Sequence, residues 1–461
     1  MIFSKSRPLI SNILAAFLLK IPILYTTFLY IFFISSENFG ETQLIVTIAS
    51  IALPIITFCL YSGFGRYLYE TEILLEIQLI TTLYVIFGLF IVTFLCILFV
   101  DQITTQTIYL KFISKLVLVL CFSWTLDIIF QQISIKLEDM EYFNKVIIIK
   151  YMLVVLCAYC FIKFSTVDFK RIFLISECIG LVISVIFFII RFKLYNAINK
   201  FNSKYFLYIF NFSTPLIFYT FGIVALSQSD RVVISQLLDI SMVGLYAYVY
   251  NAASVITLCV NGILNSLLPK FYVQKKLELD NSIESLYFVL GLSNLLLILS
   301  AIFFYILNNF VNPFPYVSVA SLSFLALVCL APSFALQLLS RELQYEKRTT
   351  ILSIGVLIGA VLNIGLNYLF IPHFGLKAAM YNTFVAIFVV YLLLLFFSKM
   401  RHKKAHLIIV ITNCLILLLI YILFDQHNIF YKILGTILAL ATIVKSFYDV
   451  KKIFNKLYGT V

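Results

Sequence analysis

The stretch LITTLYVIFGLFIVTFLCILFV, residues 79–100, is 22 residues long and carries no charge. A helix needs roughly 20 mostly apolar residues to cross the hydrocarbon core of a bilayer. Thirteen further stretches are also long and mostly apolar: 9–34, 43–62, 112–134, 146–162, 172–190, 212–229, 242–268, 283–310, 317–340, 351–371, 376–397, 407–424 and 430–447. The sequence therefore predicts an all-α integral membrane protein with about 14 transmembrane helices.

The composition of the whole chain agrees with a membrane protein. Of the 461 residues, 63% are hydrophobic and 12% are charged, and the mean hydropathy is +1.07. The core of a soluble protein cannot absorb that much apolar surface. Lys5 and Arg7 precede the first apolar stretch, which is too long for the h-region of a signal peptide. We therefore expect the first helix to remain in the membrane.

The formal net charge of +12 does not indicate nucleic-acid binding, because Lys and Arg follow the membrane topology. If the N-terminus is cytoplasmic, 22 of them lie in the loops on that side and seven lie in the opposite set. Cytoplasmic loops of membrane proteins carry such an excess. The distribution predicts that both termini are cytoplasmic.

The residue types that commonly bind metals or catalyse reactions form no cluster in this sequence. Cys157 and Cys160 form a C-x-x-C pair, but they lie inside a predicted helix with no histidine nearby. Such cysteines usually pack as small hydrophobic residues, although metal or redox chemistry is the alternative. The four histidines do not assemble into a zinc or catalytic site. We expect no metal, no cofactor and no enzymatic activity.

A weak internal similarity predicts how the chain is divided. Residues 39–40 and 243–244, at an offset of 204, each open a helix after a long helix and a short outer loop. Transporters are commonly built from such repeats. We expect an N-terminal lobe in residues 1–200, a second six-helix lobe in 201–400 and a helix pair in 401–461. Bends are expected at the prolines within helices, Pro22, Pro54, Pro215 and Pro332.

The eighth predicted helix carries a polar stripe. Its polar residues are spaced by three or four positions, which confines them to one face of a helix. They are Tyr246, Tyr250, Ser254, Thr257, Asn261 and Asn265. Hydroxyls, amides and tyrosine rings suit a wall that contacts sugars, and interhelical hydrogen bonding in a packed bundle is the alternative. We expect the stripe to line a substrate cavity.

The first predicted helix presents a matching stripe that includes Asn12, Lys20 and Thr27. Lys20 lies near the middle of the membrane, where a cation costs about 2.5–3.5 kcal/mol on insertion scales and is a functional hypothesis by default. An anionic ligand would offset this cost. A structural ion pair or a snorkelling lysine is the alternative.

Two further charged pairs lie at the predicted helices. Asp230 and Arg231 are expected at the outer end of the seventh helix, where they either close an outer gate or cap the helix. Asp127 and Lys150 lie at similar depth on consecutive antiparallel helices. A structural ion pair is the expectation for these two residues, because each then balances the other's buried charge.

Several motifs make the chain similar to the polysaccharide-transport family of lipid-linked oligosaccharide flippases, the O-antigen flippases included. In the second lobe the motifs are DRVVI at 230–234, VGLY at 243–246, LPKFY at 268–272, LNIGLNYLFIP at 362–372 and GLKAAMYNT at 375–383. In the first lobe they are FG at 39–40 and GFGRY at 63–67. The resemblance covers about residues 9–397.

The resemblance implies a two-lobed, V-shaped exporter with a central cavity lined by the first, second, seventh and eighth helices. The substrate would be a polyprenyl-diphosphate-linked oligosaccharide, moved across a bacterial inner membrane by alternating access. Lys20 occupies the place where relatives carry a cavity cation. A polysaccharide polymerase and chain-length machinery are the implied partners, and coupling to a proton or sodium gradient is left open.

Four other functions compete with this interpretation. Fourteen helices are also a feature of the related lipid II flippases, and a cation-coupled multidrug antiporter of the same superfamily would favour an acidic cavity. A membrane glycosyltransferase, polymerase or ligase would need acidic or histidine residues on a sizeable outer loop, and the outer loops here are short. A purely structural scaffold would not need the polar stripes.

Overall fold

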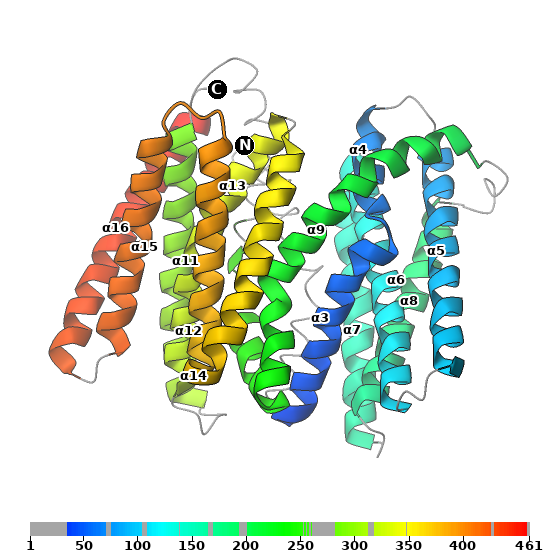
Figure 1. The fold of residues 1–461 in the computed structure, drawn as a ribbon, viewed down its shortest axis with the longest axis horizontal. Helices are drawn as coiled ribbons and strands as arrows, with labels where there is room; N and C mark the ends of the chain where they lie inside the picture. The colour runs from blue at the N-terminus through cyan, green and yellow to red at the C-terminus, as the bar shows by residue number, and fades with distance from the viewer. Residues whose placement is uncertain are drawn as a thin grey trace. The chain divides into compact units, whose positions relative to one another are not determined.

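The computed structural model describes most of the chain beyond the first predicted helix. The described residues are 35–70, 75–103, 108–137, 139–164, 169–192, 201–251, 253–254, 256–257, 260, 282–311, 318–346, 348–425 and 428–458. Their regular structure is entirely helical, with no β-strand among them. The predicted fold class, an all-α membrane protein, is confirmed (Figure 1).

The chain divides into two compact units, and the first covers the described residues from Phe17 to Val232. Its helices are α3 (Ser36–Ile56), α4 (Leu60–Glu70), α5 (Leu75–Ile103), α6 (Ile108–Lys136), α7 (Met140–Phe164), α8 (Phe169–Phe192) and most of α9 (Ser203–Leu237). Helix α6 is the centre of this unit, since it packs against α3, α4, α5, α7 and α8. The polar residues of α6 are therefore the best placed to meet groups from several helices.

The second unit runs from Val233 to Tyr458 in its described part. It contains a helical segment at 240–251 and the helices α11 (Ser282–Val311), α12 (Ser318–Cys329), α13 (Ala331–Tyr345), α14 (Thr349–Phe397), α15 (Lys403–Asp425) and α16 (Ile429–Tyr458). Helix α16 packs against both α11 and α15 (Figure 1). The predicted C-terminal helix pair is thus present as α15 and α16.

Eleven helices of the described chain are long and apolar enough to cross a membrane. One of them, α14, has 49 residues and would be about 74 Å long if straight, more than twice the ~30 Å hydrocarbon core. It is not straight. Asn382 Nδ2 donates to Asn367 Oδ1 at 3.0 Å although the two residues are 15 positions apart, which would place them about 22 Å apart along a straight helix. Helix α14 is a hairpin of the two helices predicted at 351–371 and 376–397. The described residues therefore provide twelve crossings, in agreement with about fourteen in all.

Two predicted helices are interrupted in the structure. The stretch 43–62 falls on α3 and α4, which are separated at residues 57–59, and 317–340 falls on α12 and α13, which are separated at Leu330. Proline explains the second break, since its ring removes a backbone donor and clashes with the preceding turn. Pro54 precedes the first break by three residues, and Pro332 occupies the first turn of α13.

The break between α3 and α4 has a strained backbone. Phe58 and Cys59 have φ values of 49° and 52°, which non-glycine residues rarely adopt. Local contacts hold this conformation: the Thr57 hydroxyl donates to the Leu53 carbonyl at 2.7 Å, and the Phe58 ring lies 5.7 Å from that of Phe210 in α9. Strain of this kind persists only where the surrounding structure compensates for it.

The first part of α9 packs on the first unit rather than starting the second. A side chain at Gly63 of α4 would collide with Ser213 of α9, and the Arg66 guanidinium lies 4.4 Å from the centre of the Phe212 ring. Residues 203–232 thus group with the first unit, although the sequence assigned them to the second lobe. The lobe boundaries at residues 200 and 400, and the V shape, stay predictions.

We expect Gly375→Ala to destabilise the protein. Gly375 turns the α14 hairpin with φ 62° and ψ −145°, a region that is essentially restricted to glycine and costs other residues about 1–3 kcal/mol. Gly365→Ala is the matched control, because Gly365 is exposed within the same helix and a Cβ there meets nothing within 4 Å. Thermal unfolding in detergent should show a lower midpoint for Gly375→Ala only. Equal midpoints would show that the hairpin does not depend on this glycine.

Candidate functional site

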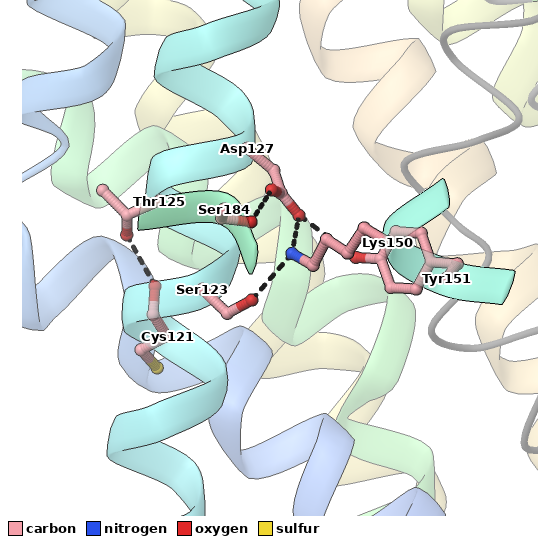
Figure 2. Close-up of polar contacts among 7 residues, drawn as sticks. All are labelled: Cys121, Ser123, Thr125, Asp127, Lys150, Tyr151 and Ser184. Carbon is pink, nitrogen blue, oxygen red and sulfur yellow. Dashed lines mark hydrogen bonds and ion pairs between the residues drawn. The ribbon is translucent and has the colours of Figure 1, made fainter. Parts of the chain in front are cut away.

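A buried polar cluster lies at the meeting point of α6, α7 and α8 (Figure 2). Lys150 Nζ lies 2.6 Å from Asp127 Oδ2 and donates a second hydrogen bond to Ser123 Oγ at 2.9 Å. The Tyr151 hydroxyl also donates to Asp127 Oδ2, at 3.1 Å, and the Ser184 hydroxyl donates to Asp127 Oδ1 at 3.1 Å. The structure thus brings Asp127 and Lys150 together as an ion pair, and its structural role stays a prediction.

The surroundings of this pair satisfy both charges. The side chains of Lys150 and Asp127 are only 0% and 3% exposed, so water cannot solvate them. The carboxylate instead accepts three hydrogen bonds, and the ammonium lies 5.0 Å from the centre of the Tyr151 ring. A buried ion pair is tolerated when such additional hydrogen bonds are present.

The sequence brings the pair together by its spacing along two consecutive helices. Asp127 lies nine residues before the end of α6 and Lys150 lies ten residues after the start of α7, so both are about 14 Å from the short turn that joins these helices. Gly180 allows α8 to approach, because a Cβ there would lie 3.2 Å from Lys150 Cε. Ser123, Tyr151 and Ser184 were not predicted. Of these three, only Ser123 could have been identified from the sequence, because it lies one helical turn before Asp127 on the same helix.

Asp230 and Arg231 lie inside α9, not at its end. The helix continues to Leu237, so a helix-capping role for this pair is wrong. Both residues are buried, and Arg231 Nη1 donates to Gln43 Oε1 at 3.3 Å and to Thr47 Oγ1 at 3.5 Å, both on α3. The apolar residues that follow, VVI at 232–234, explain why the helix continues. The outer-gate role stays a prediction.

The polar stripe of the eighth predicted helix is described in part. The rings of Tyr246 and Tyr250 are stacked, with centroids 5.6 Å apart and an interplanar angle of 19°, and both side chains are buried. The hydroxyls of Ser254 and Thr257 donate to carbonyls of their own helix at 2.7 and 2.6 Å, and both residues are half-buried. The remaining members of the predicted cavity, Asn12, Lys20, Thr27, Asn261 and Asn265, lie outside the described residues.

Amide side chains tie together the two halves of the α14 hairpin. Asn382 donates to Asn367, and Asn367 Nδ2 donates in turn to Asn363 Oδ1 at 3.4 Å. Asn363 and Asn367 are completely buried, and Asn382 is nearly so. Two of these asparagines fall in the motif at 362–372 and the third in the motif at 375–383. The hydrogen bonds among these three asparagines support the fold of the hairpin.

Comparison with known protein families shows the family of the chain. A family model described as polysaccharide biosynthesis protein matches residues 8–274, more than half of the chain. The chain belongs to this family. The matched region contains the whole Asp127 cluster and the stacked tyrosines of the eighth helix.

Three solved structures resemble the fold of this family member. An inward-facing MATE family transporter of the MOP superfamily has a TM-score of 0.62 and 12% identity, covering 84% of this chain and 95% of its own. A MATE transporter of Vibrio cholerae has a TM-score of 0.55 and 12% identity, covering 88% and 97%. A MOP superfamily transporter of Pyrococcus furiosus has a TM-score of 0.51 and 11% identity, covering 87% and 96%. No match was found among curated proteins.

The described part of the chain holds no group of three or more His, Cys, Asp or Glu side chains that could bind a metal. Cys157 is half-buried and Cys160 is exposed on α7, and both thiols are free. The polar features of the described residues include the Asp127 cluster, the contact of Arg231 with α3, the stacked tyrosines and the asparagines of α14.

Proposed function

We propose that the protein is a flippase for polyprenyl-diphosphate-linked oligosaccharides, the repeat units of O-antigen, capsule or exopolysaccharide. The family match over residues 8–274 carries this proposal. The transporter works by alternating access in a bacterial inner membrane, with both termini in the cytoplasm. A polysaccharide polymerase and chain-length machinery act on the exported product. Coupling to a proton or sodium gradient is part of the same proposal.

Complementation in three genetic backgrounds tests the substrate class. The protein is expressed in a strain that lacks its O-antigen flippase, in a strain depleted of its lipid II flippase and in a drug-sensitive strain that lacks its efflux pumps. We expect surface polysaccharide to return in the first strain only. Growth of only the second strain would favour a lipid II flippase, and drug resistance of only the third would favour a multidrug antiporter. Either result would contradict the proposal.

We further expect the polar stripe of the eighth helix to line a cavity that water can enter. Single cysteines at Tyr250, Thr257 and Asn261, placed in a background without the nine native cysteines, should react with a water-soluble maleimide. Cysteines at Val249 and Val260 are the matched controls, because both positions are 0% exposed on the same helix. Equal labelling at both sets of positions would contradict the cavity.

A further inference from the structure

The Asp127 cluster has the composition of a binding site for a hard cation. The polar atoms that surround the ammonium and the carboxylate are all oxygen: Asp127 Oδ2 and Ser123 Oγ accept from Lys150, and the hydroxyls of Tyr151 and Ser184 donate to the Asp127 carboxylate (Figure 2). These residues come from α6, α7 and α8, so the oxygens approach from several directions. Hard cations prefer carboxylate and other oxygen ligands, and hydroxyl groups can rotate to present their lone pairs.

The occupant of this cluster is the ammonium of Lys150. It is completely buried and lies within hydrogen-bonding distance of two of the oxygens, Asp127 Oδ2 at 2.6 Å and Ser123 Oγ at 2.9 Å. The single carboxylate is therefore balanced by a single positive charge. A divalent ion in place of the ammonium would leave an excess charge in a buried site, so the size of the charge selects a monovalent cation.

The packing around Lys150 keeps space for the lysine. Gly180 on α8 faces its stem, and a Cβ at this position would lie 2.9 Å from Val154 Cγ2 and 3.2 Å from Lys150 Cε. Shortening Lys150 would vacate the space beside Asp127 that its stem and ammonium fill. The vacated space and the uncompensated carboxylate would together make a site for a free ion.

We propose that the Asp127 cluster is a monovalent-cation site that the protein fills with its own Lys150. The tethered ammonium makes α6, α7 and α8 independent of free Na⁺ at this position. The coupling ion of transport, if it is a metal cation, binds elsewhere. The inference does not depend on the substrate of the transporter, and it predicts that removing Lys150 uncovers a site for Na⁺.

The test compares three proteins purified in detergent: the wild type, Lys150→Ala and Asp127→Asn/Lys150→Ala. Thermal unfolding is measured in NaCl, KCl and choline chloride at equal ionic strength. The wild type should unfold at the same temperature in all three salts. Lys150→Ala should gain a saturable stabilisation in NaCl over choline, of roughly 5 °C when the salt is far above Kd. The double variant keeps the vacated space but lacks the carboxylate, so it should show no such gain.

Several results would overturn the proposal. Lys150→Ala that is equally stable in the three salts would show that Asp127 does not take a metal cation. A saturable Na⁺ effect on the wild type that Asp127→Asn removes would show that the site is not filled by the lysine. If Lys150→Ala does not accumulate, Lys150→Ser replaces it. Failure of both to accumulate in the presence of Na⁺, with normal levels of the double variant, would equally contradict the inference.

Discussion

Export of surface polysaccharide should be lost when Lys20 is replaced by glutamate and should largely persist in Lys20→Arg. The diphosphate of the proposed substrate carries about two negative charges, and one opposite charge at roughly 4 Å contributes about 4 kcal/mol at an effective dielectric constant of ~20. Glutamate turns this attraction into repulsion of similar size. Arginine keeps both the charge and its position. Lys20 lies outside the described residues, so this expectation rests on the sequence and the proposed function.

The measurement is complementation of a flippase-deficient strain, with the amount of protein in the membrane determined for each variant. Lys432→Glu is the matched control, because it makes the same charge reversal at an exposed position of α16 and should leave export intact. Normal export by a well-expressed Lys20→Glu protein would show that this cation is not on the path of the diphosphate. Loss of export in the control would show that charge reversal acts non-specifically.

Separating Asp127 from Lys150 should cost the protein about 3–5 kcal/mol of unfolding free energy, because a single buried charge remains. We expect this loss in Asp127→Leu and in Lys150→Met, measured by thermal unfolding in detergent. The double variant Asp127→Leu/Lys150→Met leaves neither charge buried and should recover most of the loss. A double variant less stable than both single variants would show that the pair is not the source of the effect.

A partly exposed ion pair between α5 and α6 provides a control for this unfolding experiment. Lys115 Nζ lies 3.9 Å from Asp101 Oδ2, but the lysine side chain is 46% exposed. A partly exposed ion pair contributes about 0–1 kcal/mol. Lys115→Met should therefore unfold close to the wild type. A loss as large as that of Lys150→Met would mean that removing any lysine from this unit is damaging, whatever its burial.

The sequence alone predicted the features that depend on local pattern. The length of each apolar stretch set the class of protein and the place of its helices, because crossing a bilayer is a requirement on consecutive residues. The Asp127–Lys150 pair could also be predicted, since both residues lie at equal depth on helices joined by a short turn. The positions of the two helix breaks could not be predicted from the sequence. A proline indicates that a helix is disturbed, but it does not indicate the residue at which the helix ends.

Tertiary structure decided which distant residues meet. Ser184 joins Asp127 from 57 positions away, and Arg231 reaches Gln43 across 188. Such contacts depend on how closely helices pack and how they are rotated, and glycines such as Gly180 set the approach at single points. The left-handed conformation of Phe58 and Cys59 has the same origin, because packing against α9 overrides their local preference. Sequence pattern specified the helices of this protein, and packing between them specified its buried polar cluster.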